Sequence, residues 1–153
     1  MQDAITDLCG EYQPYRGGYV HRGFLRSAKW IEEHYLAELK RYVSKYKAQN
    51  LCIVGHSLGG SIAALFSILI RSHEQEFVSL SPKFRLRCFT YGCPPCMSEH
   101  LADSCKTDVY SFVNETDIVP RLGYGAMSDL REMIVHTAEV LKLSGSEKVC
   151  IRV

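Results

Sequence analysis

The sequence predicts an α/β fold with a mainly parallel sheet flanked by helices. Short apolar runs rich in β-branched and aromatic residues recur along the chain. Between them lie segments with apolar residues every three or four positions, and glycine or proline separates the two kinds of segment. Because consecutive parallel strands need a crossover, usually a helix, this alternation is typical of βαβ units.

The first expected helix covers residues near 24–47, after an irregular stretch over residues 1–20 in which Pro14 and Gly17-Gly18 mark turns. Its apolar positions recur at helical spacing: Ala28, Ile31, Tyr35, Leu39, Tyr42 and Tyr46. A buried strand is expected at 51–54, followed by a helix at 58–72 that is apolar nearly all round. Because residues 51–70 carry no acidic or basic side chain, a membrane-spanning helix is the alternative for that stretch.

The remaining elements follow the same alternation. We expect strands at 87–91 and 108–113, a helix at 128–143 and a last strand at 148–153. Ligands of parallel sheets bind at the carboxyl ends of the strands, so the residues that follow each strand are the candidate site.

Composition indicates one soluble globular domain over residues 1–153, with 46% hydrophobic and 23% charged residues. The net charge of +1 favours neither nucleic acid nor an anionic membrane as a partner. Seven cysteines and no secretory signal favour a reducing compartment, so we expect the protein in the cytoplasm or at the cytoplasmic face of a membrane. Cys93-Pro94-Pro95-Cys96 has the spacing of a redox pair or half a zinc site, but a plain loop is the favoured interpretation and no metal is expected.

The sequence Gly55-His56-Ser57-Leu58-Gly59 fits a nucleophile elbow, a strained turn between a strand and a helix. Small residues two positions before and after the serine allow the turn, which exposes the hydroxyl to substrate. The helix N-terminus then directs N–H groups, that of Leu58 among them, at a developing oxyanion. Asp117 follows the strand at 108–113 and is the best candidate acid, with a turn-forming aspartate as the equal alternative.

These motifs resemble the class 3 lipases, a family of α/β-hydrolases, and most closely their sn-1-specific diacylglycerol-lipase-like branch. The ordered matching blocks are Asp3-Ala4-Ile5-Thr6-Asp7-Leu8, Val20-His21-Arg22-Gly23-Phe24-Leu25, Gly55-His56-Ser57-Leu58-Gly59-Gly60, Phe89-Thr90-Tyr91-Gly92-x-Pro94 and Asn114-x-x-Asp117-x-Val119-Pro120. The resemblance implies Ser57 as nucleophile, Asp117 as acid, the Leu58 N–H as an oxyanion donor and an acylglycerol lipid as substrate. It implies no cofactor, and it leaves peripheral membrane contact and oligomeric state open.

The same resemblance predicts an incomplete domain. The family's oxyanion strand belongs upstream of Asp3, and its catalytic histidine belongs on a loop beyond Val153. His136 is the only histidine after Asp117, but its helical context argues against a role as base, and neither His21 nor His56 is a better candidate. We therefore expect the 153-residue chain alone to be inactive. The alternative function is a non-catalytic, lipase-like interaction module.

Overall fold

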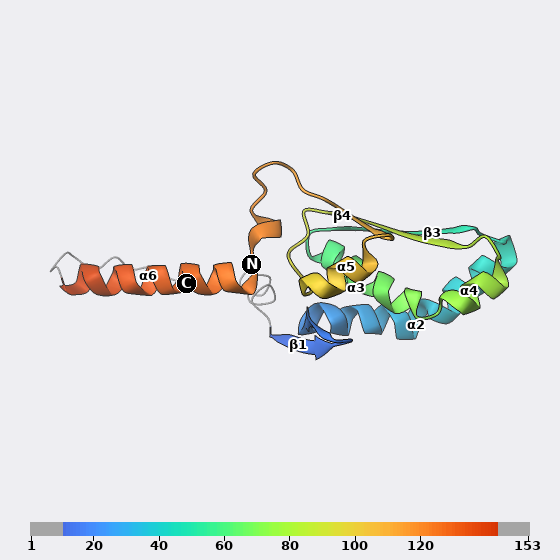
Figure 1. Ribbon diagram of the computed structural model, residues 1–153, viewed down its shortest axis with the longest axis horizontal. Helices are drawn as coiled ribbons and strands as arrows, with labels where there is room; N and C mark the ends of the chain where they lie inside the picture. Colours follow the sequence, from blue (N-terminus) through green and yellow to red (C-terminus); the bar gives the residue numbers. More distant parts are fainter. Residues whose placement is uncertain (1–10, 144–153) are drawn as a thin grey trace.

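The computed structural model describes residues 11–143. Figure 1 shows a layered core of strands and helices, from which a long last helix extends away. In chain order the elements are β1 (Tyr12–Tyr15), β2 (Gly18–His21), α2 (Arg22–Tyr46), β3 (Asn50–His56), α3 (Leu58–Arg71), α4 (Glu74–Leu80), β4 (Arg85–Tyr91), α5 (Glu99–Cys105), β5 (Val109–Phe112), the 3₁₀ turn η1 (Val119–Arg121) and α6 (Tyr124–Leu143). The strand expected at 148–153 lies outside the described residues.

The main sheet has the order β3-β4-β5, and both pairs are parallel. The register pairs Ile53 with Cys88 and Cys88 with Val109. All three strands therefore end at the same edge of the sheet. The three expected strands and the parallel arrangement are confirmed, with β3 reaching two residues further, to His56.

Helix α3 lies between the sheet and α2, which explains its composition. Ten of its 14 residues are buried, because one side packs on β3 and β4 and the other on α2. This burial confirms the prediction from its nearly continuous apolar sequence. The break at Ser57 between β3 and α3 also excludes one continuous helix over 51–70. No helix in the described part of the chain is long and apolar enough to cross a membrane.

The opposite face of the sheet carries no helix among residues 11–143 (Figure 1). Side chains on that face are exposed although they are large and apolar, as for Val54 at 63% and Phe112 at 50%. The rings of Phe89, Tyr91, Tyr110 and Phe112 stack on one another across β4 and β5. The expectation that 51–54 is fully buried was therefore wrong, because helices cover only one face.

The expectation of an irregular stretch over residues 1–20 was wrong for the residues that the structure describes. Residues 12–21 form an antiparallel hairpin, with Arg16 and Gly17 at positive φ in its turn. Helices α4 and α5 were also missed, since each has only seven residues, too few for a repeating 3.6-residue pattern.

Candidate active site at the end of the sheet

Ser57 occupies the turn between β3 and α3, in a backbone conformation that few residues adopt. Its φ of 53° and ψ of −130° lie outside the common regions, and this is the strain that an elbow requires. The Ser57 N–H donates to the carbonyl of Tyr91 at 2.9 Å, which extends the β3–β4 ladder by one residue. The serine is thus held by the sheet on one side and by α3 on the other.

The glycines around Ser57 differ in how much space surrounds them for a side chain. A Cβ atom on Gly55 would lie 2.6 Å from the Gly59 carbonyl carbon and 2.7 Å from Gly60 Cα, so only glycine fits there. A Cβ on Gly60 would lie 2.8 Å from Cβ of Cys93. At Gly59, in contrast, a Cβ would meet nothing within 4 Å among the described residues. The close packing of this turn therefore depends on Gly55 and Gly60, whereas the sequence motif emphasised Gly55 and Gly59.

Leu58 is the first residue of α3. The first N–H groups of a helix have no partner within the helix, and they carry the positive end of its dipole. The Leu58 N–H therefore lies beside Ser57 at the positive end of the α3 dipole. A 14-residue helix directly behind the serine adds a favourable field for an oxyanion at this point.

Asp117 lies in the loop after β5, partly buried. Its own N–H donates to the Asn114 carbonyl at 2.7 Å, and its Oδ1 accepts the Val119 N–H at 3.0 Å. These local bonds fix the carboxylate orientation. They also satisfy the alternative interpretation of a turn-forming aspartate, so they do not by themselves select a catalytic role.

The dipeptide Tyr91-Gly92 brings Ser57 and Asp117 to one edge of the sheet. The Tyr91 carbonyl accepts the Ser57 N–H, and a Cβ on Gly92 would lie 2.6 Å from Oδ2 of Asp117. Gly92 has a φ of 53°, and its N–H donates to the Phe112 carbonyl at 2.9 Å. One carboxylate oxygen of Asp117 therefore lies directly against Gly92, and the preceding residue, Tyr91, is hydrogen-bonded to Ser57.

The loop 92–97 connects this edge to the rest of the molecule. The buried Ser61 hydroxyl donates to the Pro94 carbonyl at 2.7 Å, the Tyr12 hydroxyl donates to the Pro95 carbonyl at 2.9 Å, and the His21 N–H donates to the Cys96 carbonyl at 2.8 Å. Bonds from α3, β1 and β2 thus hold the loop.

The two cysteines of this loop, Cys93 and Cys96, have no feature of a reactive pair in the structure. Both are free thiols, and burial raises the pKa of Cys96 to about 12. A reactive thiol needs a lowered pKa, which is the opposite shift. Among residues 11–143 no group of three metal-ligating side chains is placed to hold an ion.

The histidines considered from the sequence lie in other environments. His21 is buried, caps α2 by accepting the Phe24 N–H on Nδ1 and stacks on the Phe24 ring. His56 is exposed on the open face of the sheet. His136 is exposed on α6, the helix that extends away from the core (Figure 1).

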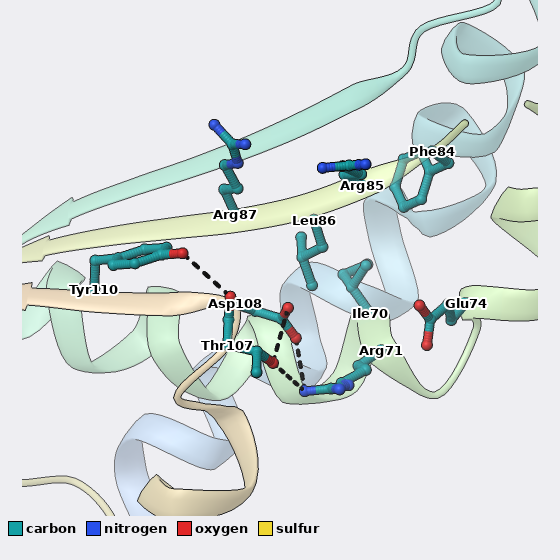
Figure 2. A pocket seen from close by; sticks show the side chains of 10 residues that line it. All are labelled: Ile70, Arg71, Glu74, Phe84, Arg85, Leu86, Arg87, Thr107, Asp108 and Tyr110. Carbon is teal, nitrogen blue, oxygen red and sulfur yellow. Dashed lines mark hydrogen bonds and ion pairs between the residues drawn. The ribbon is translucent and has the colours of Figure 1, made fainter.

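A cavity of about 280 Å³ lies at the other end of the sheet, where β4 and β5 begin. Figure 2 shows Arg71 of α3 paired with Asp108, at 2.7 Å, on one side of this cavity, with Arg85 and Arg87 on β4 pointing away from that pair. Its lining contains neither the strained serine nor Asp117. The candidate site is therefore the Ser57 edge.

Comparisons with known proteins show what this chain is similar to. A family model described as Lipase (class 3) matches residues 2–126. Diacylglycerol lipase-alpha of Rattus norvegicus is 30% identical over 96% of this chain, and a lipase of Rhizopus niveus is 31% identical over 80%. The crystal structure of a lipase from Rhizopus microsporus var. chinensis superposes with a TM-score of 0.69 at 29% identity, over 83% of this chain.

A further solved structure is titled for a serine protease triad that forms the catalytic centre of a triacylglycerol lipase. It matches with a TM-score of 0.66 and 27% identity over 82% of this chain. The chain covers 48% of that structure and 45% of the Rhizopus microsporus lipase. It covers 14% of diacylglycerol lipase-alpha and 32% of the Rhizopus niveus lipase, so it spans a minor part of each curated relative.

Proposed function

Since the chain belongs to the class 3 lipase family, with an α/β-hydrolase-type fold, we propose that it forms the catalytic centre of a serine lipase that cleaves acylglycerol esters. The observation that carries the proposal is the pairing of two special backbone conformations at one edge. Ser57 is held at a φ of 53°, and Gly92, at a positive φ that glycine adopts without strain, leaves space for the Asp117 carboxylate. Backbone strain such as that at Ser57 costs about 1–3 kcal/mol and is concentrated at functional sites.

In the proposed reaction the Ser57 hydroxyl oxygen attacks the ester carbonyl carbon while a histidine accepts the hydroxyl proton. The carbonyl oxygen becomes negatively charged and accepts the Leu58 N–H. The tetrahedral intermediate collapses, the ester C–O bond breaks, and the histidine returns the proton to the leaving alcohol. Water then attacks the acyl-enzyme in the same way, which releases a fatty acid and regenerates Ser57.

Asp117 would orient the histidine and stabilise its charged form. We propose that this histidine, and a second oxyanion donor, come from parts of the protein outside residues 1–153. Support comes from the environments of three histidines: His21 caps α2, His56 is exposed on the open face of the sheet and His136 is exposed on α6. An acylglycerol substrate is supported by the names of the relatives, which include diacylglycerol lipases and fungal lipases. We also propose a location in the cytoplasm or at the cytoplasmic face of a membrane, and the five free thiols among the described cysteines support a reducing compartment.

The test is hydrolysis of a diacylglycerol by the full-length protein and by its Ser57→Ala and Asp117→Ala variants. We expect kcat to fall about 10⁴-fold or more for each. Matched controls are Ser79→Ala and Asp103→Ala, which change exposed residues of α4 and α5 and should keep full activity. A serine-reactive fluorophosphonate should label Ser57 in the wild type, as read by peptide mass spectrometry.

Undiminished turnover by Ser57→Ala would contradict the mechanism. Absence of both turnover and labelling in the folded full-length protein would favour the non-catalytic interaction module instead. The 153-residue chain alone should show little or no turnover, because a triad without its base loses about 10⁴-fold or more. Full activity of that chain would mean that one of its own histidines is the base.

A further inference from the structure

A groove of about 740 Å³ lies beside the first turns of α2. Gln13 of β1 lines it together with Leu25, Arg26, Lys29, Trp30 and Ile31 of α2, and we call this the α2 groove. Leu25 is buried and Ile31 partly buried, so they give the groove an apolar floor. Arg26 and Lys29 are exposed on its wall.

The α2 groove is lined by more cationic than anionic side chains. Arg22 also lines it, and Arg22 pairs with Glu11 at 2.9 Å. Arg26 and Lys29 form no ion pair with any residue in the range 11–143. The lining includes one carboxylate, that of Glu33. Two cations are thus left without a protein partner beside an apolar floor, which suits an anionic amphiphile.

Trp30 adds a feature typical of membrane interfaces. Its side chain is 51% exposed, although tryptophan is the largest apolar residue. Its ring stacks on His34 with centroids 4.3 Å apart and meets Tyr35 edge-on at 6.0 Å. Tryptophan and tyrosine favour the headgroup level of a bilayer, where one part of the ring is apolar and another is hydrated.

The α2 groove lies at the same end of the molecule as Ser57. His21, which immediately precedes α2, donates its N–H to the Cys96 carbonyl, and the Pro94 carbonyl of the same loop accepts the Ser61 hydroxyl of α3. Figure 1 shows α2 beginning at the end where the strands of the main sheet finish. A surface bound at this groove would therefore lie near the proposed catalytic edge.

We propose that the α2 groove docks the protein on an anionic bilayer, with lipid phosphates on Arg26 and Lys29 and the Trp30 ring at headgroup level. The proposal rests on the proposed function in one respect: the use of docking would be to hold Ser57 beside a lipid substrate. The net charge of +1 does not predict it, because α2 concentrates cations that are balanced by acidic residues elsewhere. A lipid surface is favoured over nucleic acid because the floor is aliphatic.

The experiment measures co-sedimentation of the purified full-length protein with two kinds of vesicle, phosphatidylcholine alone and equal parts phosphatidylcholine and phosphatidylserine. We expect Arg26→Gln/Lys29→Gln to bind the mixed vesicles about fivefold to thirtyfold more weakly. Each lysine or arginine near an anionic surface strengthens binding about fivefold, and the variant lacks two of them. Trp30→Ala should weaken binding to both kinds of vesicle. Thermal unfolding verifies that each variant is folded.

The matched control is Arg41→Gln/Lys45→Gln, which removes the same charge from exposed positions in the second half of α2. We expect this variant to bind like the wild type. Equal losses in the two double variants, or no loss in Arg26→Gln/Lys29→Gln, would overturn the proposal. Displacement by inorganic phosphate, beyond that by chloride at equal ionic strength, would indicate a site for soluble phosphate and overturn it, as would displacement by a single-stranded oligonucleotide.

Binding is also measured for Ser57→Ala, which should dock normally. That result separates the two proposals, because docking persists even if Ser57 is not the nucleophile. Conversely, a diacylglycerol dispersed in neutral detergent should be hydrolysed equally by wild type and Arg26→Gln/Lys29→Gln if the groove acts only in docking. Lost turnover in detergent would show that these residues serve the catalytic site and would overturn a docking role.

Discussion

Gly92 and Asp117 lie so close that a single methyl group on the glycine would be 2.6 Å from Oδ2 of the aspartate. The two residues are 25 positions apart, in the turns after β4 and β5. A glycine is required for a second reason, since its φ of 53° disfavours other side chains. The Asp117 carboxylate therefore occupies space that is open only because Gly92 carries no side chain.

Replacing Gly92 with alanine should displace Asp117 and reduce catalysis. A shift of about 1 Å in a catalytic group costs on the order of 10²-fold in rate, so we expect kcat of the full-length protein to fall by about that factor. Gly17→Ala is the matched control, because Gly17 also has a positive φ but a Cβ there meets nothing within 4 Å. Similar kcat losses in both variants would contradict the steric explanation.

The glycines of the elbow should respond differently to the same substitution. Gly55→Ala places a methyl group against the backbone of Gly59 and Gly60, so we expect a loss of about 1–3 kcal/mol in unfolding free energy. Gly59→Ala should be neutral or stabilise by up to about 1 kcal/mol, because alanine favours helix and finds open space. Urea unfolding measures both values, and the reverse order would refute this assignment.

Two buried serines of α3 provide a test of how the loop 92–97 is held. Ser61→Ala leaves the Pro94 carbonyl without its buried donor, so we expect destabilisation of about 1–3 kcal/mol and reduced kcat. Ser67→Ala removes a bond to the Ala63 carbonyl within the same helix and a contact with the Cys88 thiol of β4, neither of which involves the loop, so it should leave kcat unchanged. Chemical unfolding and diacylglycerol turnover distinguish the variants; equal effects would mean that the loop is anchored elsewhere.

His73 should make stability depend on pH. Its two ring nitrogens contact Glu76 at 2.8 Å and Glu32 of α2 at 2.9 Å, and these hydrogen bonds raise the pKa of His73. Lys40 and His73 lower the pKa of Glu76 in turn. The stabilisation from His73 is fully present below its unfolded pKa of about 6.5 and is lost as pH rises through the higher folded pKa. The Glu76 contribution is lost when pH falls through its lowered pKa.

Urea unfolding of wild type and His73→Gln at about pH 5.5 and about pH 8.5 tests this dependence. The difference in unfolding free energy should be larger at the lower pH. His100→Gln, at an exposed position of α5, should show no such trend. A His73→Gln difference that is constant, or that grows as pH rises, would show that the charged pair does not stabilise the fold.

The sequence alone determined the long elements and the local part of the site. The three strands of the main sheet, the helices α2, α3 and α6, and the turn at Ser57 each depend on residues within a few positions of one another. Apolar spacing and one strained turn report such local interactions directly. For Asp117, the position after a strand supported an acid and a turn-forming aspartate equally, and the resemblance to class 3 lipases favoured the acid.

Tertiary structure decided what depends on distant contacts. Only packing shows that Gly60 is constrained and Gly59 is not, because the constraint on Gly60 comes from Cys93. Only the parallel register places Gly92 against Asp117, and only the position of the helices leaves one face of the sheet uncovered. These features depend on contacts between residues that are distant in the sequence. The order of apolar and polar residues along the chain does not show which distant residues will meet.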